Sequence, residues 1–203
     1  MSPAPIRLLI ATNNPGKRRE LQALLADLPL ELLLPSEIGI ELHPAEEGES
    51  YAENARHKAI TFARASGLPS LADDSGLEVD ALGGAPGLHS ARYHPRPGAT
   101  DAERRALLLE HLRPFPRPWS ARFRAVVALA HPNGEIHLAE GICEGEIIPE
   151  ERGQNGFGYD PIFLLNELGR TMAELSLEEK NRLSHRARAV QGLRPFILRY
   201  LEP

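Results

Sequence analysis

The sequence contains few cysteines, few aromatic residues and no long apolar run. A single cysteine among 203 residues, Cys143, excludes an intramolecular disulfide and a cysteine-rich metal site, and it favours a reducing, cytoplasmic setting. No segment approaches the roughly 20 apolar residues that cross a membrane, and the first residues lack the basic and apolar regions of a secretory signal. We therefore expect a cytoplasmic protein that is neither secreted nor inserted into a membrane.

Charge of either sign is spread along the chain. The 23 basic and 28 acidic residues give a net charge of −5, and no basic tail or stripe predicts binding to nucleic acid or to a membrane surface. Lysine is scarce, with three lysines against 20 arginines. The three lysines are Lys17, Lys58 and Lys180, and two of them lie beside other chemically suggestive residues, where a compact ammonium would suit a phosphate oxygen better than a planar guanidinium.

Apolar residues follow the pattern of an α/β domain. Residues 6–11 predict a buried strand, the polar turn 12–16 follows, and leucines at helical spacing predict a helix that stops at Pro29. Residues 123–130 and 136–148 predict two strands of a hairpin, because Asn-Gly lies in the turn between them. The expected fold is a mixed sheet with helices on its faces.

Three further helices are predicted from capping boxes, in which Ser or Thr is followed three residues later by Glu. The pairs are Ser50 with Glu53, Thr100 with Glu103, and Ser176 with Glu179. The first helix is expected to stop at Gly67, and the second to run to Leu112. The third is expected to continue through residues 184–186 until Pro195 interrupts it.

The loop over residues 12–17 ends a predicted strand and begins a predicted helix, where backbone N–H groups attract an anion. Asn14 and Lys17 could add side-chain donors. The spacing of a Walker A loop is absent, and a solvated Asn-Pro-Gly turn is an equally good interpretation.

Asp73 and Asp74 are adjacent carboxylates at the end of a short apolar stretch. Neighbouring side chains of a strand point to opposite faces, so one carboxylate can enter a pocket while the other is bound within the structure. A carboxylate here could hold Mg²⁺ together with a second one from residues 46–49. The alternative for either acidic cluster is an ordinary acidic turn.

Glycines flank Phe157 within residues 155–163, so the backbone can approach a ligand and the ring is left open for stacking on a base. A glycine-rich turn before a buried strand is the alternative. Lys180 and Ser184 are expected to share a helical face that either contacts a ligand or meets water.

Together these segments resemble the Ham1/RdgB family of non-canonical purine nucleoside triphosphate pyrophosphatases, also called inosine triphosphate pyrophosphatases. The resemblance spans nearly the whole chain. Its motifs occur in the family's order, and they are Thr12 to Lys17, Glu46 before Glu53-Asn54-Ala55, Ala72 to Leu77, Gly83 to Gly87, Ser90 to Tyr93, Phe157 to Pro161, and Lys180 with Ser184-His185-Arg186.

The resemblance implies a single domain over residues 1–203 with two lobes, a long mixed central sheet flanked by helices, and a substrate cleft between the lobes. It implies a homodimer that hydrolyses ITP, dITP and XTP to the monophosphate and pyrophosphate with Mg²⁺, removing deaminated purines from the nucleotide pool. Asp74 would be the general base and a metal ligand, with Glu46 as the second ligand and Glu47 as the alternative. The substrate-binding residues would be Thr12, Asn13, Asn14, Pro15, Gly16, Lys17, Ser75, Phe157, Gly158, Tyr159, Asp160, Lys180, His185 and Arg186.

Two other functions are compatible with parts of this pattern. The first is a Maf-like nucleotide pyrophosphatase that acts on modified pyrimidines or other bases, although residues 157–160 and 184–186 argue against it. The second is a nucleotide-binding protein without turnover, which the full set of acidic and cationic candidates makes the weaker alternative.

Overall fold

A computed structural model describes residues 5–201 as two compact units. Within this range, unit 1 takes the chain up to Asp74, Ala125–Gly141 and the chain from Arg186 onward, and unit 2 takes Ser75–Arg124 and Ile142–His185. Among the described residues, no helix is both long and apolar enough to cross a membrane.

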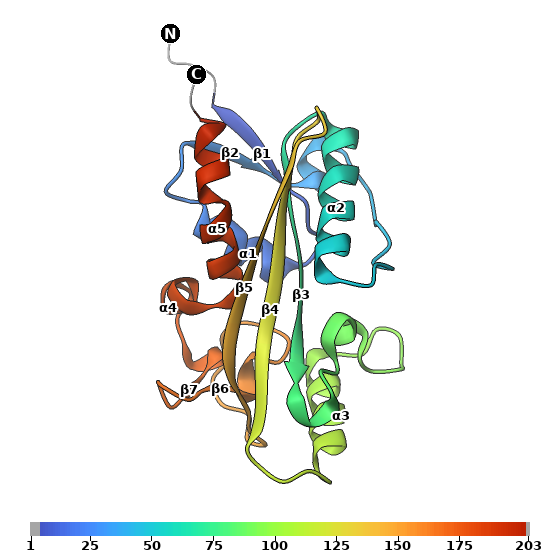
Figure 1. Cartoon of the computed structure of the whole chain (residues 1–203), viewed down its shortest axis with the longest axis vertical. Helices are drawn as coiled ribbons and strands as arrows, with labels where there is room; N and C mark the ends of the chain where they lie inside the picture. The colour runs from blue at the N-terminus through green and yellow to red at the C-terminus, as the bar shows by residue number, and fades with distance from the viewer. Residues whose placement is uncertain (1–4, 202–203) are drawn as a thin grey trace. The chain divides into compact units, whose positions relative to one another are not determined.

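The regular elements follow one another along the chain as the α/β pattern predicts (Figure 1). The strands are β1 (Ile6–Ile10), β2 (Leu30–Leu33), β3 (Ser70–Val79), β4 (Trp119–Ala130), β5 (Ile136–Ile147), β6 (Phe163–Leu165) and β7 (Arg170–Thr171). The α-helices are α1 (Pro15–Leu24), α2 (Tyr51–Ser66), α3 (Asp101–Leu112), α4 (Leu177–Leu183) and α5 (His185–Arg199). Short 3₁₀ helices are η1 (Pro35–Ile38), η2 (Asp80–Leu82), η3 (Gly87–Arg92), η4 (Asp160–Ile162) and η5 (Met172–Glu174).

The strands form one mixed sheet in the order β2-β1-β3-β4-β5-β6-β7. Strand β1 pairs in parallel with β2 and β3, whereas β6 pairs antiparallel with β5 and β7. The turn between β4 and β5 is closed by the His131 N–H, which donates to the Glu135 carbonyl at 2.8 Å. The predicted α/β class, mixed sheet and hairpin are therefore confirmed.

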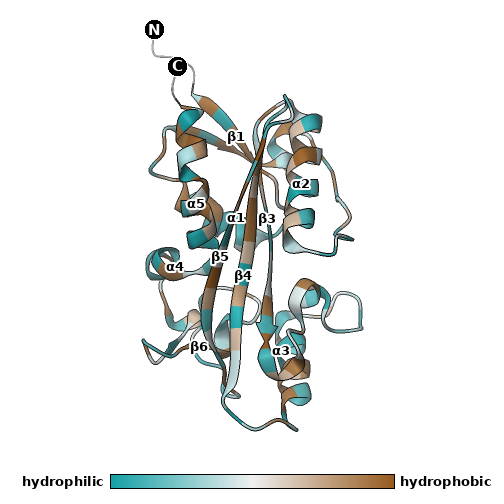
Figure 2. Cartoon of the chain, in the orientation of Figure 1, coloured by the Kyte–Doolittle hydropathy of each residue, from teal (hydrophilic) through white to brown (hydrophobic). Residues whose placement is uncertain are grey.

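In unit 1, helices cover both faces of the sheet (Figure 1). Helix α2 lies on one face and buries Ala55, Ala59 and Phe62, while α1 and α5 lie on the other. Hydrophobic and hydrophilic residues alternate along these helices (Figure 2). Leu21 of α1 and Leu193 of α5 are fully buried in one cluster with strand residues, and each such side chain stabilises the fold by about 1.5–3 kcal/mol.

Unit 2 has its own apolar core, in which α3 packs against strand residues. Leu108 and Leu112 of α3 are fully buried in one cluster with Leu77 of β3 and Phe163 of β6. The ring of Phe123 contacts that of Phe163 with a centroid distance of 4.5 Å. These contacts fix the C-terminal end of α3 against the core of unit 2.

The predicted helix starts are confirmed, with one change in capping. Thr100 and Ser176 form complete capping boxes with the glutamates three residues later. Ser50 accepts a hydrogen bond from the Glu53 N–H at 3.2 Å, but the Glu53 carboxylate accepts from the Glu49 N–H instead of from Ser50. Helix α2 ends as predicted at Gly67, where the backbone turns into the left-handed region with φ of 67°.

The single helix predicted through residues 184–186 is wrong, because the chain is extended at Ser184 and divides it into α4 and α5. Pro195 lies inside α5 and does not interrupt it. Buried side chains on both sides of this proline, Leu193 and Ile197, belong to one apolar cluster and hold the helix together. The first helix also ends earlier than predicted, at Leu24, well before Pro29.

Candidate active site

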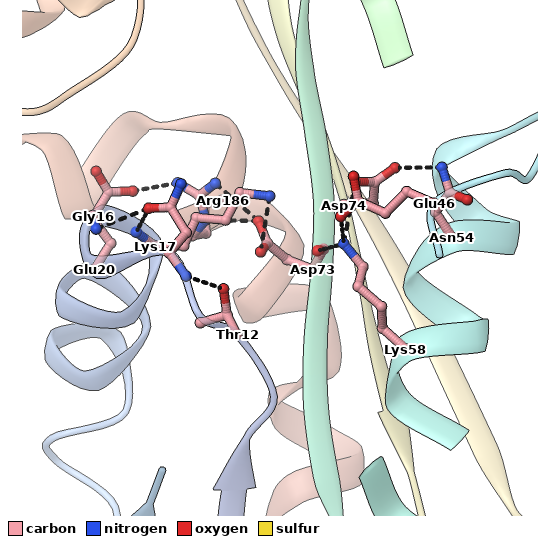
Figure 3. A network of polar contacts seen from close by, with 11 residues as sticks. Thr12, Gly16, Lys17, Glu20, Glu46, Asn54, Lys58, Asp73, Asp74 and Arg186 are labelled. Carbon is pink, nitrogen blue, oxygen red and sulfur yellow. Dashed lines mark hydrogen bonds and ion pairs between the residues drawn. The ribbon is translucent and has the colours of Figure 1, made fainter. Parts of the chain in front are cut away.

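The side chains of Asp73 and Asp74 leave β3 on opposite faces, as the alternation of a strand requires (Figure 3). Asp73 points toward Arg186 and Lys17, and Asp74 points toward Asn54 and Lys58. Both carboxylates are almost completely buried, but Asp73 lies among side chains of α1 and α5, whereas Asp74 lies among side chains of α2. The two neighbours therefore have different electrostatic surroundings.

Asp73 belongs to a buried ion cluster in unit 1. One oxygen of its carboxylate accepts hydrogen bonds from Nε and Nη2 of Arg186, each at 2.9 Å, and Lys17 Nζ lies 3.3 Å from the other oxygen. The same guanidinium donates to the buried carboxylate of Glu20. Burial raises the pKa of Asp73, but Arg186, Lys17 and Lys58 outweigh it and hold this pKa well below its usual range. Asp73 is therefore a fixed anion within the fold.

Asp74 instead faces a lysine that contacts three oxygen atoms. Lys58 Nζ lies 2.8 Å from Glu46 Oε1, 2.7 Å from the main-chain oxygen of Asp73 and 3.3 Å from Asp74 Oδ1. Asn54 Nδ2 donates to the second oxygen of Asp74 at 3.0 Å. Burial raises the pKa of Asp74 despite the opposing effects of Lys58, Lys17 and Asn54. A carboxylate with a raised pKa is a better proton acceptor than Asp73 can be.

Lys58 remains charged in this environment. Burial lowers its pKa, but the carboxylates of Asp74, Asp73 and Glu46 have the larger combined effect and raise it. Its ammonium therefore holds Glu46 and Asp74 around a single positive charge. We call Glu46, Lys58 and Asp74 the acidic site.

The loop that carries Glu46 is fixed to the first turn of α2. The Gly48 N–H donates to Asn54 Oδ1 at 2.8 Å, and the Glu49 N–H donates to Glu53 Oε2 at 2.7 Å. A Cβ atom at Gly48 would lie 2.7 Å from Asn54 Oδ1, so only glycine allows this approach. Glu47 is exposed, whereas Glu46 is half-buried and contacts Lys58. Of the two candidate ligands, Glu46 is therefore the one held next to Asp74.

The side chains of the acidic site fit a divalent cation with oxygen ligands. Glu46 and Asp74 already converge on one cationic group, and Mg²⁺ prefers carboxylate oxygens. Over residues 5–201, no three His, Cys, Asp or Glu side chains gather as a metal cage. Mg²⁺ is usually held by one or two carboxylates, with its remaining ligands from water and phosphate, and Glu46 and Asp74 offer two carboxylates.

The loop over residues 12–17 connects β1 to α1 as predicted. Asn14 caps the helix, because its Oδ1 accepts hydrogen bonds from the N–H groups of Gly16 at 2.9 Å and Lys17 at 3.0 Å. Thr12 Oγ1 accepts from the Asn14 N–H, and Asn13 Nδ2 donates to the carbonyl of Leu42. Asn13, Asn14 and Pro15 are exposed, so the loop presents polar groups to solvent at the helix N-terminus.

Lys17 is the cation of this loop, and it lies in the first turn of α1. Its ammonium is directed toward Asp73 (Figure 3). The pKa of Lys17 is lowered, mainly because the side chain is buried. The positive charges of Lys58 and Arg186 lower it further, and the negative charge of Asp73 opposes this. The loop therefore combines an exposed edge with a cation anchored to the buried cluster.

In unit 2, Asp160 organises the glycine-rich loop over residues 155–160. Its Oδ2 accepts hydrogen bonds from the Phe157 N–H at 2.9 Å and from Lys180 Nζ at 2.5 Å. A Cβ atom at Gly156 would clash with this same oxygen, and φ there is +76°. Lys180 Nζ also lies 5.2 Å from the centroid of the Phe157 ring. The loop thus holds a partly exposed aromatic ring beside a buried ion pair.

Tyr159 and His185 are buried within unit 2. The hydroxyl of Tyr159 donates to the Ser90 carbonyl at 2.9 Å, and burial raises its pKa. The chain after Tyr159 forms η4 and then β6, not the continuous strand of the alternative interpretation.

The ring of His185 stacks on Phe123 with a centroid distance of 4.9 Å and an interplanar angle of 17°. Ser75 follows Asp74 in β3 and is partly exposed.

The predicted residues therefore fall into one group in each unit. Unit 1 holds the loop of residues 12–17, Glu46, Asp74 and Arg186, whereas unit 2 holds Ser75, residues 157–160, Lys180 and His185. The sequence predicted none of the contacts that Lys58, Glu20 and Asn54 make. The scarcity of lysine did mark Lys58, and it lies four residues after Asn54 on α2, but nothing in the sequence marks Glu20 as the partner of Arg186.

Comparison with known proteins finds relatives that match most of the chain. The family model of the Ham1 family matches residues 8–196. The dITP/XTP pyrophosphatase of Thermus thermophilus is 50% identical over 189 residues, which are 93% of this chain and 90% of that protein. The dITP/XTP pyrophosphatase of Desulfotalea psychrophila is 46% identical over 198 residues, which are 96% of this chain and 88% of that protein.

The structural likeness is equally broad. A solved HAM1 protein from Coxiella burnetii matches with a TM-score of 0.85 and 42% identity, covering 96% of this chain and 99% of that chain. The α/β fold with a mixed sheet is therefore that of the solved Ham1 proteins. The chain belongs to the Ham1 family.

Proposed function

We propose that this protein hydrolyses non-canonical purine nucleoside triphosphates, namely ITP, dITP and XTP, to the monophosphate and pyrophosphate. The observation that carries this proposal is the acidic site, where Glu46 and Asp74 share one ammonium while the neighbouring Asp73 is held as a fixed anion. Family membership supports the reaction, because two relatives at 46–50% identity are dITP/XTP pyrophosphatases.

Asp74 is the proposed general base. Its carboxylate would accept a proton from the attacking water, while Asn54 and Lys58 keep both of its oxygens in place. The new bond joins the water oxygen to phosphorus, the anhydride bond between the α- and β-phosphates breaks, and pyrophosphate leaves. Glu46 and Asp74 would hold Mg²⁺, which when bound would neutralise charge on the phosphate oxygens.

The loop of residues 12–17 is proposed to bind the triphosphate. Lys17 supplies a cation, and the N-terminus of α1 supplies the partial positive charge that favours an anion. Asn13 and Asn14 are exposed beside it and carry amide donors. These groups would stabilise the negative charge that grows on the departing pyrophosphate.

The base is proposed to be read by the residues carried over from the resemblance. Phe157 offers a ring for stacking, and Ser75, Gly158, Tyr159, Asp160 and Lys180 are further proposed substrate-binding residues. Donors at His185 and Arg186 would meet the oxygen at position 6 of inosine and xanthosine, where adenosine has an amine, so ATP leaves them unpaired. The guanidinium of Arg186 already donates to Asp73 and Glu20, which supports an additional role in positioning Asp73.

Separating the products of ITP hydrolysis tests the proposed function. We expect equimolar IMP and pyrophosphate, formed only when Mg²⁺ is present. Release of orthophosphate, or no turnover of ITP, XTP or dITP at saturating Mg²⁺, contradicts the proposal. The homodimer implied by the resemblance is a separate proposal, and sedimentation at micromolar concentration tests it.

A further inference from the structure

Two side chains of α3 hold both backbone polar groups of Gly158. Asp101 Oδ2 accepts a hydrogen bond from the Gly158 N–H at 2.7 Å, and Arg105 Nη1 donates to the Gly158 carbonyl at 2.8 Å. Asp101 and Arg105 are four residues apart and therefore lie on one face of the helix. This pair, which we call the α3 clamp, was assigned no role by the sequence or by the resemblance.

The clamp is itself held in place. Nε and Nη2 of Arg105 donate to the two carboxylate oxygens of Glu151, both at 2.8 Å, and the Arg105 side chain is only 11% exposed. Asp101 also accepts from Arg104, which donates to the Ala99 carbonyl at 2.5 Å. A bidentate arginine pair fixes direction as well as distance. The guanidinium thus reaches Gly158 with little freedom of its own.

Gly158 follows Phe157, the proposed stacking ring, so its geometry sets the direction of that side chain. The Gly158 N–H belongs to the peptide plane shared with Phe157, and the Gly158 carbonyl belongs to the next plane. The Phe157 N–H is fixed separately by Asp160. Gly158 has φ of +61°, a conformation that a non-glycine residue rarely adopts. The peptide planes on both sides of Phe157 are therefore hydrogen-bonded to buried or anchored groups.

We propose that Asp101 and Arg105 are positioning residues that hold the Phe157 ring in the orientation needed to stack on a purine base. This inference rests on the proposed function, because it assigns the ring to substrate. It goes beyond that function by placing part of the base recognition in α3, outside every motif of the family resemblance. Since the clamp acts on binding of the base and not on the bond that breaks, its loss should raise KM and leave kcat nearly unchanged.

Four variants test the clamp by steady-state kinetics with ITP. Arg105→Met keeps the apolar stem but removes the guanidinium, and Asp101→Ala removes the acceptor; each should raise KM about tenfold, with kcat within about twofold. Asp101→Asn keeps an acceptor oxygen and should restore most of the lost affinity. Glu103→Gln weakens the capping of the same helix turn without touching Gly158, so its KM should stay at the parent value.

Hydrogen exchange of the substrate-free protein provides a readout that is independent of turnover. Peptides covering residues 156–160 should exchange faster in Arg105→Met and Asp101→Ala than in the parent and in Glu103→Gln. Unchanged exchange overturns the clamp, and faster exchange with an unchanged KM overturns its role in base binding. If the parent itself does not turn over ITP, the proposed function and the assignment of Phe157 to a base fail together, while the exchange difference still decides whether the clamp holds the loop.

Discussion

Asp73 and Asp74 are adjacent in sequence, yet their carboxylates lie on opposite faces of β3 and contact different cations (Figure 3). Asp73 is bound by Arg186 and has a lowered pKa, whereas Asp74 is bound by Lys58 and Asn54 and has a raised pKa. Substitution by asparagine should therefore have different consequences at the two positions. At Asp73 it should lower stability, and at Asp74 it should lower turnover.

Asp73→Asn is expected to destabilise the fold. The substitution removes a charge from a buried pair and leaves Arg186 with Glu20 as its carboxylate partner, which should lower the free energy of unfolding by about 3 kcal/mol. Urea denaturation at pH 7 measures this loss. A parent-like midpoint would show that the ion cluster does not hold unit 1 together.

The ion pair of Asp73 and Arg186 predicts how the stability of the fold depends on pH. Because the folded-state pKa of Asp73 is lowered, its contribution to stability is complete above the pKa of an unfolded aspartate, about 4, and is lost as the pH falls toward the folded value. The difference in stability between the parent and Asp73→Asn should therefore be constant from pH 6 to 8 and shrink below about pH 4. A difference that grows in acid contradicts this assignment.

Asp74→Asn is expected to abolish most turnover while the fold remains intact. Loss of a general base typically lowers kcat by about 10²- to 10⁴-fold. The raised pKa shows that burial disfavours the Asp74 anion, so removing the charge should not lower the midpoint of urea denaturation at pH 7. Near-normal kcat with ITP would exclude Asp74 from the chemistry.

Glu46→Gln is expected to weaken metal binding, and Glu47→Gln is its matched control. Glu46 shares Lys58 with Asp74, whereas the neighbouring Glu47 is exposed. Calorimetric titration of each variant with Mg²⁺ should show at least about tenfold weaker binding for Glu46→Gln and parental affinity for Glu47→Gln. The reverse order would make Glu47 the ligand.

Phe157→Ala is expected to raise KM for ITP by about tenfold, because stacking of a base on an aromatic ring contributes about 1–3 kcal/mol. The substitution should leave kcat nearly unchanged, since the proposed mechanism gives the ring no part in breaking the anhydride bond. Phe115→Ala removes an exposed ring that has no role in the proposed function, and it serves as the control. Equal KM values for the two variants would contradict stacking of the base on Phe157.

Local patterns were sufficient to predict much of this molecule, and long-range contacts were not. The capping residues Thr100 and Ser176, the Asn-Gly turn and the opposite directions of Asp73 and Asp74 follow from interactions among residues close in sequence. The pairing of Arg186 with Glu20 depends on how α5 and α1 pack on the sheet, which no local pattern contains.

The error at Pro195 has the same physical origin. Proline disfavours a helix interior locally, but burial of Leu193 and Ile197 on the sheet outweighs this preference. Likewise, the scarcity of lysine marked Lys58 without showing what it contacts. Only the packing of α2 against β3 brings its ammonium to Glu46 and Asp74.

Comparison of kcat/KM for ITP, XTP, GTP and ATP tests the central claim most directly. Initial rates should be measured with and without Mg²⁺, with pyrophosphate and orthophosphate quantified separately. We expect Mg²⁺-dependent release of pyrophosphate, with ITP and XTP preferred over ATP because adenine presents an amine where the protein offers donors. Comparable kcat/KM for ATP and ITP would contradict the proposed recognition of deaminated purines.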